Sequence, residues 1–135
     1  MMKAILVFLW QLPQNLLGLL LWAGAKLSGK CAFAVPKTNK DDAVMIYVTG
    51  FPGAVTLGQY IVLGVKYIDY DGTTERHERG HARQSCWLGP LYLLAIGLPS
   101  LIHAALWRPG KGSYYDFYTE RWADHIAGIK REEGV

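Results

Sequence analysis

Two long apolar stretches, each interrupted near its middle, constrain the fold of this chain most strongly. They occupy residues 1–25 and Leu88–Trp107 and hold much of the 51% hydrophobic content of the 135 residues. An unbroken run of about 20 apolar residues would predict a straight transmembrane helix. Here polar residues and a proline at positions 11–15 break the first stretch, and Gly97 and Pro99 divide the second. We therefore expect two bent or interfacial segments within a single membrane-associated domain, residues 1–135.

The first apolar segment, residues 1–25, begins like a signal sequence. Its stretch Ala23-Gly24-Ala25 is similar to a cleavage site, but a signal core is normally an unbroken apolar run. We therefore expect a retained, kinked or interfacial N-terminal anchor, with cleavage as the alternative. Residues 26–43, which are basic and turn-prone, predict a linker.

The charge and aromatic content of the chain favour a membrane over a nucleic acid as partner. The net charge is +3, the basic residues are scattered, and no basic strip with interleaved aromatics occurs. Tryptophans and tyrosines flank the apolar stretches, which is typical of side chains at a membrane surface. Cys31 and Cys86 form no CxxC motif and are too few for a disulfide scaffold, although one pairing stays open. Membrane lipid is the expected partner, and a membrane the expected location.

Two segments between the apolar stretches have the composition of β-strands. Val44–Gly50 and Gln59–Gly72 are rich in β-branched and aromatic residues, and glycines and a proline separate them. The pattern predicts a short β hairpin. The edge of its second strand, Gln59–Tyr70, could pair with an extended peptide.

A helix predicted from about residue 73 to 88 carries the sequence HERGHARQS. His77 and His81 are four residues apart, so they project from one face of the helix and can bind one zinc ion. Glu78 between them can take a proton from a water molecule on that ion. The arginine-rich context favours the alternative of a surface helix whose histidines face water.

A second helix is predicted after Ser113, because apolar residues recur at helical spacing as far as Ile129. Glu120 and Asp124 lie four residues apart on one face of it. A catalytic zinc ion has three protein ligands and one open position, so one of these carboxylates could complete the site. The other could accept the N–H of a ligand histidine. The alternative is an exposed acidic pair on the polar side of the helix.

The order H-E-x-x-H and then E-x-x-x-D on a later helix resembles the gluzincin metallopeptidases, especially the small membrane-associated kind. This resemblance implies that His77, His81 and Glu120 hold zinc, that Glu78 is the catalytic base, and that Asp124 orients a ligand histidine. Segments along most of the chain, among them LWQLPQNLLG, HERGHARQS and FYTERWAD, also resemble a group of small uncharacterised bacterial membrane proteins. That second resemblance implies no activity, but it implies a location at the bacterial inner membrane.

Other polar residues near the two helices are further candidates. Tyr114, Tyr115 and Tyr118 precede Glu120 closely, and one phenol could donate a hydrogen bond to an oxyanion, with core packing as the alternative. His103 and His125 could be ligands in another arrangement, but a histidine with a structural hydrogen bond is the more common case.

The sequence therefore predicts an α+β, membrane-associated, zincin-like fold with a core in residues 44–135. The apolar segment 88–107 should be re-entrant or interfacial and divided at Gly97 and Pro99, because His77 and Glu120 must reach one Zn²⁺ ion from the same side of a membrane. The predicted function is hydrolysis of peptide bonds, in a peptide or protein substrate, by a membrane-associated zinc metallopeptidase. The alternative is a non-catalytic membrane interaction protein or an inactive zincin-like scaffold.

Overall fold

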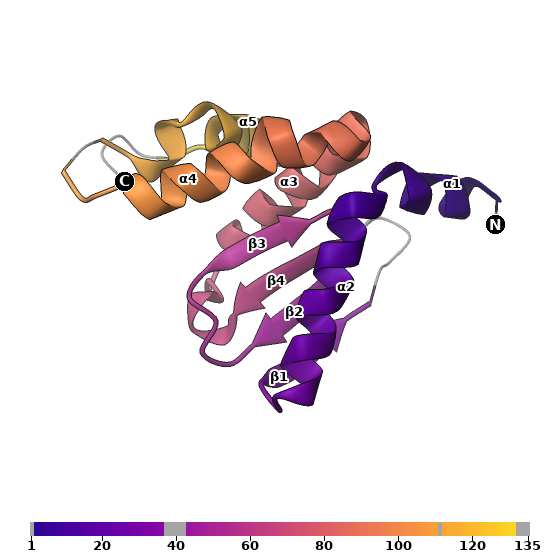
Figure 1. Ribbon diagram of the computed structural model, residues 1–135. Helices are drawn as coiled ribbons and strands as arrows, with labels where there is room; N and C mark the ends of the chain where they lie inside the picture. Colours follow the sequence, from indigo (N-terminus) through magenta and orange to yellow (C-terminus); the bar gives the residue numbers. More distant parts are fainter. Residues whose placement is uncertain (1, 37–42, 111, 132–135) are drawn as a thin grey trace.

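The computed structural model describes residues 2–36, 43–110 and 112–131. These residues form an α+β fold with one small four-stranded sheet and five α-helices, which confirms the predicted class (Figure 1). The strands are β1 (Cys31–Val35), β2 (Val44–Val48), β3 (Ala54–Leu57) and β4 (Tyr60–Gly64). They lie side by side in the order β1-β2-β4-β3.

The sheet differs from the predicted hairpin in its pairing. The two predicted strands are neighbours, as β2 and β4, but they run parallel, with Val44 opposite Tyr60 and Val48 opposite Gly64. The antiparallel hairpin consists of β3 and β4, which join through the two residues Gly58 and Gln59. Strand β1 lies within the segment predicted to be a linker. Since β4 is flanked on both sides, it has no free edge for a peptide; among the described strands β3 and β1 end the sheet.

Two helices of equal length cover opposite faces of the sheet. Helix α2 (Leu12–Leu27) packs on one face through Ala25, over side chains of β2 and β4 that include Ile46 and Val62. Helix α3 (Thr73–Leu88) packs on the other face through Ala82. The alternation of side chains along a strand gives each helix its own half of the core.

The N-terminal apolar segment is bent, as predicted. Helix α1 (Met2–Trp10) meets α2 at an angle of 88°, with Gln11 between them. The polar residues at this bend are buried against the end of α3. Gln14 donates to Ser85 Oγ (2.9 Å) and to the carbonyl of Gly89 (2.8 Å), and Ser85 donates to Gln11 Oε1 (2.6 Å).

The second apolar segment bends at a different place from the one predicted. A 3₁₀ turn at Gly89–Leu91 follows α3, and the chain then runs through a π-helical turn, Leu93–Gly97, directly into α4 (Leu98–Leu106). The 120° bend lies between Leu91 and Leu93, so the predicted division at Gly97 and Pro99 is wrong. Pro99 has no N–H for the carbonyl of Ala95 one turn earlier, and the hydroxyl of Tyr118 donates to that carbonyl instead (2.7 Å).

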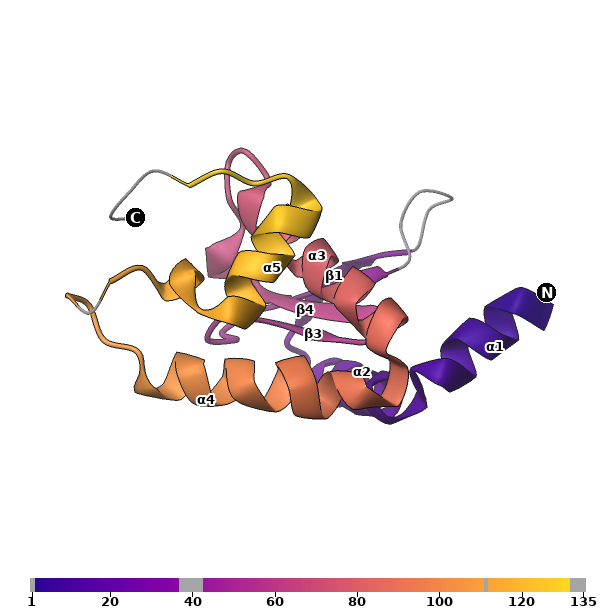
Figure 2. The ribbon, with the colours of Figure 1, turned by 90° about the horizontal axis from the view of Figure 1, so that it is seen from above.

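Helices α1, α2 and α4 lie along one side of the molecule (Figure 2). The last helix, α5 (Tyr118–Ala127), lies beside α3, packs closely on it and also contacts α4. Within the described parts of the chain no single helix combines the length and apolar character needed to cross a membrane. Two bent pairs, α1 with α2 and α3 with the helical segment Leu93–Leu106, meet that requirement together by length and composition.

Candidate metal centre

Helix α3 begins where the chain can satisfy its free N–H groups. Gly72, at φ +74°, precedes the helix in the left-handed region that glycine tolerates. The side chain of Asp71 accepts the N–H of Thr73, and that of Asp69 accepts the N–H of Thr74 (2.8 Å). Carboxylates at this end also interact favourably with the helix dipole. The HERGH motif therefore starts in the second turn of a well-capped helix.

The close contact of α3 with α5 brings the two halves of the centre together. A Cβ at Gly80 would overlap the carbonyl oxygen of Ala123, so glycine is required for this approach. Gly80 lies on the face of α3 that also carries His77 and His81, and Ala123 lies between Glu120 and Asp124 on the buried face of α5.

Three side chains at this contact point their potential ligand atoms at a common position. Nε2 of His77 lies 2.7 Å from Glu120 Oε2, and Nε2 of His81 lies 3.0 Å from the same oxygen. The three atoms all lie within 4.8 Å of one another. The three residues are buried, with 3–5% of their surface exposed. This is the one group among the described residues whose positions suit a metal ion.

The other nitrogen of each imidazole is held by an acceptor. Nδ1 of His77 donates to Asp124 Oδ1 (2.7 Å), and Nδ1 of His81 donates to Gln84 Oε1 (2.7 Å). Gln84 is itself fixed by the carbonyl of Thr119 (3.2 Å). A proton on each Nδ1 leaves the Nε2 lone pair available, which is the tautomer that a metal ligand needs.

Arg131 supports Asp124 from beyond the end of α5. Its Nε and a terminal nitrogen donate to both carboxylate oxygens of Asp124, at 2.7 and 3.0 Å. The guanidinium also stacks on the ring of Tyr115, 3.3 Å from its centroid, and Tyr115 meets His77 edge-on. A chain of contacts therefore runs from Arg131 through Asp124 to His77.

Glu78 lies next to the two histidines and is held by the edge strand. The hydroxyl of Thr56 in β3 donates to Glu78 Oε2 (2.7 Å). The hydroxyl of Tyr92 donates to the backbone carbonyl of the same threonine (3.0 Å). One strand residue therefore connects Glu78 to the turn before α4.

Without a metal ion the charges of the centre stabilise one another. Burial lowers the pKa of His77, but hydrogen bonds to Asp124 and Glu120 outweigh it and raise the pKa to about 9. The pKa of His81 is also raised, since burial is outweighed by Glu120 and Glu78. Burial raises the pKa of Glu120, but its bonds to His77 and His81 lower it well below the usual range. Metal-free, the centre is therefore an ionised cluster.

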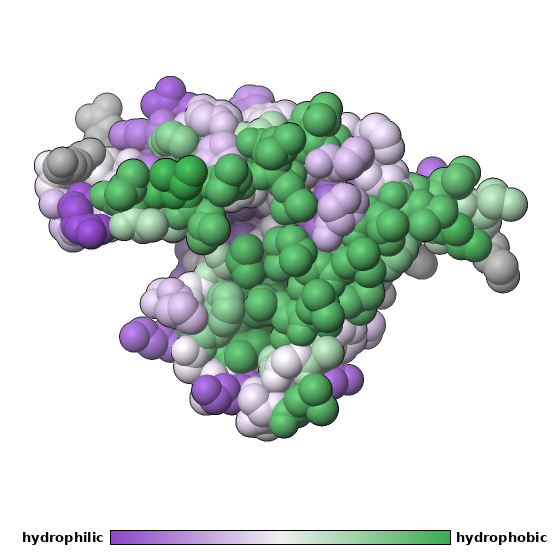
Figure 3. Space-filling model, in the orientation of Figure 1, coloured by the Kyte–Doolittle hydropathy of each residue, from purple (hydrophilic) through white to green (hydrophobic). Residues whose placement is uncertain are grey.

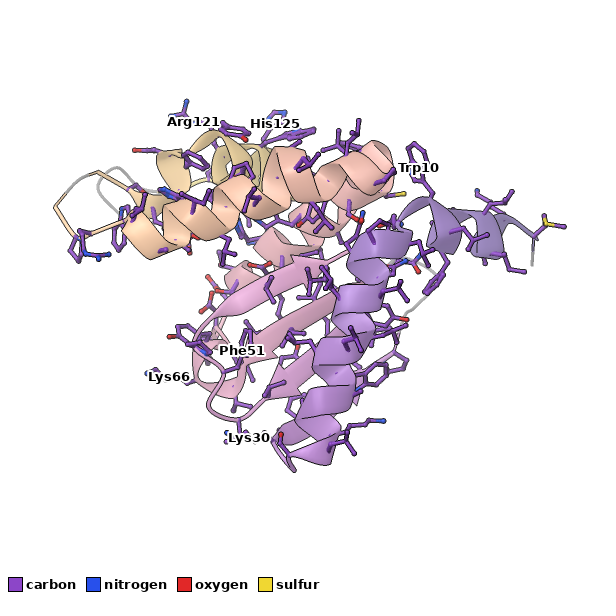
Figure 4. All side chains as sticks on the ribbon, viewed as in Figure 1. Trp10, Lys30, Phe51, Lys66, Arg121 and His125 are labelled. Atoms are coloured by element: carbon purple, nitrogen blue, oxygen red, sulfur yellow. The ribbon has the colours of Figure 1, made fainter. Side chains whose placement is uncertain are left out.

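The structure places some of the remaining candidate residues near the centre and others away from it. The ring of Tyr115 lies against His77, and the pKa of Tyr114 is raised by burial and then by Glu120 and Glu78, which places it close to the carboxylates. The hydroxyl of Tyr118 is bonded to the carbonyl of Ala95 instead. The two other histidines and both cysteines are separate from the centre. His103 stacks on Tyr114 and Phe117, His125 lies on the outer side of α5 (Figure 4), and Cys31 and Cys86 form no disulfide with each other.

Several residues of the centre were not found by sequence reasoning. Gln84 follows His81 by three residues, so helical spacing was a signal that could have identified it. Thr56 and Arg131 have no such local signal, because they reach Glu78 and Asp124 through the pairing of β3 and the turn after Gly128.

No known protein family, curated protein or solved structure matches this chain. The chemistry of the centre must therefore be argued from its geometry.

Proposed function

We propose that this protein is a zinc-dependent hydrolase that cleaves peptide bonds. The observation that carries the proposal is the convergence of two imidazole Nε2 atoms and one carboxylate oxygen, with each imidazole held by a hydrogen-bond partner of its own. Three protein ligands and an open fourth position are typical of catalytic zinc sites.

The donor set favours zinc over other common ions. Two neutral imidazoles and one carboxylate suit Zn²⁺, whereas Mg²⁺ and Ca²⁺ take oxygen ligands. When bound, zinc would supply Lewis acidity and bring the pKa of a water ligand to about 7. His77, His81 and Glu120 would hold it, and Asp124 and Gln84 would keep both histidines in the ligand tautomer.

Glu78 is the residue that we expect to move the proton. Its carboxylate would take a proton from the attacking water and later return it to the leaving amine, acting first as base and then as acid. The hydroxyl of Thr56 holds one of its oxygens, which limits the rotamers that Glu78 samples. Tyr114 and Tyr115 are the two remaining candidates to stabilise negative charge on the substrate oxygen.

The edge strand β3 supports a peptide as substrate. In the β3–β4 hairpin, Val55 and Leu57 lie opposite Val62 and Tyr60. The backbone groups of Ala54 and Thr56, which alternate with them along β3, face away from β4. An extended peptide could add to such an edge through its main chain. The carbonyl of Thr56 is taken by Tyr92, so a peptide would have to displace that bond or pass beside it.

A second candidate is a non-catalytic protein that uses the ion structurally. The burial of the centre favours it, since His77, Glu78, His81 and Glu120 all have 7% or less of their surface exposed. A structural zinc site is normally closed by four protein ligands, however, and the described residues bring three together. The number of ligands therefore favours the hydrolase.

Metal content tests the proposal directly. We expect about one zinc ion per chain in purified protein, measured by mass spectrometry of the metal, and loss of most of it in the His77→Ala, His81→Ala double variant. The matched control is the double variant His103→Ala, His125→Ala, which removes two histidines outside the centre and should keep zinc. Stoichiometric zinc in the first double variant would contradict the proposed site.

A further inference from the structure

The outer surface of α1, α2 and α4 is apolar to an unusual extent. Most of the large hydrophobic side chains that are exposed among the described residues lie on these helices and on the turn before α4. Leu20, Leu94, Leu101 and Leu106 each expose 67–70% of their surface. As far as the description reaches, α1 and α4 bury none of their residues. We call the surface made by α1, α2 and residues 91–106 the apolar face.

The apolar face is continuous and lies on one side of the molecule. Figure 2 shows α1, α2 and α4 along the same side, with the sheet, α3 and α5 behind them. Figure 3 views that side directly and shows hydrophobic residues over most of it. Soluble monomers rarely expose apolar patches larger than a few hundred Å², and larger ones mark an interaction surface.

The charges around the apolar face select the kind of partner. All eleven acidic residues of the chain lie in residues 41–42, 69–78 and 116–133, so the segments that form the face carry none. Those segments carry the exposed basic residues Lys3 and Lys26, and the exposed Lys30 and Arg108 follow within three residues of their ends. Apolar side chains with cations and no anions match an anionic lipid surface.

A groove on the same side has the matching chemistry. It has a volume of about 540 Å³ and lies between α2 and the sheet, lined by apolar side chains that include Leu17, Leu21 and Phe51, with Lys30 also in its wall. An acyl chain fits the apolar lining, and an ammonium beside it suits a lipid phosphate. Figure 4 places Lys30 at the end of α2 and Lys66 below Phe51, on the periphery of this side.

We infer that the apolar face lies on the surface of an anionic lipid bilayer, with α1, α2 and α4 in the interface. A second copy of the chain is a poorer occupant, because symmetric contact through this face would oppose like charges with no acidic partner. In the bilayer-bound orientation α4 lies between the lipid and α5. The metal centre is then about one helix diameter, roughly 10 Å, from the lipid surface.

Vesicle binding tests the inference independently of any metal or activity. Full-length protein is sedimented with phosphatidylcholine vesicles with and without phosphatidylglycerol. We expect at least about tenfold tighter binding when phosphatidylglycerol is present. The variant Leu20→Glu, Leu101→Glu should bind at least about tenfold more weakly than wild type. The matched control Ile68→Glu, Tyr70→Glu changes exposed apolar residues in the loop before α3 and should bind like wild type.

A local probe keeps the test valid if a variant folds poorly. An environment-sensitive fluorophore is attached at Leu98→Cys on the apolar face, or at Arg121→Cys on α5, in a Cys31→Ser, Cys86→Ser background. Anionic vesicles should shift the emission of the first probe to shorter wavelength and leave the second unchanged. Equal response of the two probes, or no binding by wild type together with a dimer that Leu20→Glu, Leu101→Glu dissociates, would overturn the inference.

Discussion

Helices α2 and α3 have the same length, 16 residues, and cover opposite faces of the same sheet, but they use their side chains in opposite ways. Helix α2 is mainly apolar, yet it buries Gln14 and Asn15 and exposes most of its leucines. Helix α3 is mainly polar and buries His77, Glu78 and His81. Burial in this protein therefore follows from what each helix contacts and cannot be read from its hydropathy.

The buried polar residues of the two helices also differ in purpose. Those of α2 satisfy the backbone: Asn15 accepts the N–H of Gln59 and donates to the carbonyl of Phe8, and Gln14 donates to that of Gly89. In α3, by contrast, His77 and His81 converge on one point with Glu120. We therefore expect the buried polar residues of α2 to serve packing and those of α3 to serve the proposed chemistry, and the following changes test this expectation.

The largest contrast between α3 and α2 should come from replacing a buried carboxylate of α3 by its amide and a buried amide of α2 by its carboxylate. Glu78→Gln keeps the shape of the side chain but removes its capacity to take a proton, so we expect hydrolysis to fall at least about 10³-fold with zinc retained. Asn15→Asp is the matched change in α2. It should leave the rate of hydrolysis unchanged but lower the unfolding free energy by about 2 kcal/mol, because it buries a charge and removes a hydrogen-bond donor. Peptide cleavage and denaturant unfolding measure the two effects. Cleavage at the wild-type rate by Glu78→Gln would exclude this residue as the base.

A rise in pH should lower the stability of the metal-free protein and raise its affinity for zinc. In the metal-free protein the pKa of His77 is raised to about 9 by its carboxylate partners despite burial, so its contribution to stability is complete below about pH 6.5 and is lost as pH rises through 9. Zinc must displace that proton, so apparent zinc affinity should rise at least about tenfold per pH unit up to about pH 9.

Calorimetry in buffers of different ionisation enthalpy would count the released protons, and unfolding of the chelator-treated protein would measure the stability. Helix α2 carries no histidine, aspartate or glutamate, so we expect the pH dependence in this range to come from α3 and α5. Zinc affinity that is independent of pH between 6.5 and 9 would contradict the ionised cluster.

Glycine-to-alanine changes compare the packing of the two helices. Gly80→Ala places a methyl group against the backbone of Ala123, so we expect a loss of about 1–3 kcal/mol in unfolding free energy and at least about tenfold weaker zinc binding. Gly24→Ala in α2 has open space around the new Cβ and should be neutral or stabilising by up to about 1 kcal/mol. Equal effects of the two changes would show that α3 and α5 are not in the close contact described.

The smallest expected effect concerns the support of Asp124. Arg131→Gln removes the charge that holds both carboxylate oxygens, and we expect zinc affinity to fall about fivefold to tenfold, because outer partners orient a ligand histidine. Lys130→Gln removes a neighbouring exposed charge and should leave the affinity unchanged. Competition with a chromogenic chelator measures both, and equal affinities for the two variants would separate Arg131 from the centre.

Local spacing in the sequence was sufficient for part of the fold and of the candidate centre. The composition around 44–50 and 59–72 identified two strands, and the capped, polar segment after Gly72 identified α3 with the correct end at Leu88. Helical periodicity placed His77 and His81 on one face of α3, and Glu120 and Asp124 on one face of a second helix. These features depend on residues close in the chain, which is why periodicity and capping patterns were informative.

The sequence by itself therefore determined helix α3, a later helix that carries Glu120 and Asp124, two of the strands and the faces that carry the ligand candidates. Only the tertiary structure decided that β2 and β4 run parallel, that the turn before α4 lies at Gly89–Leu91, and that Thr56 and Arg131 join the centre. It also decided that Gln11 and Gln14 interrupt an apolar stretch in order to bind the end of α3. The physical reason is that strand pairing and the partners of buried polar groups depend on contacts between residues far apart in sequence, which leave no local periodicity to read.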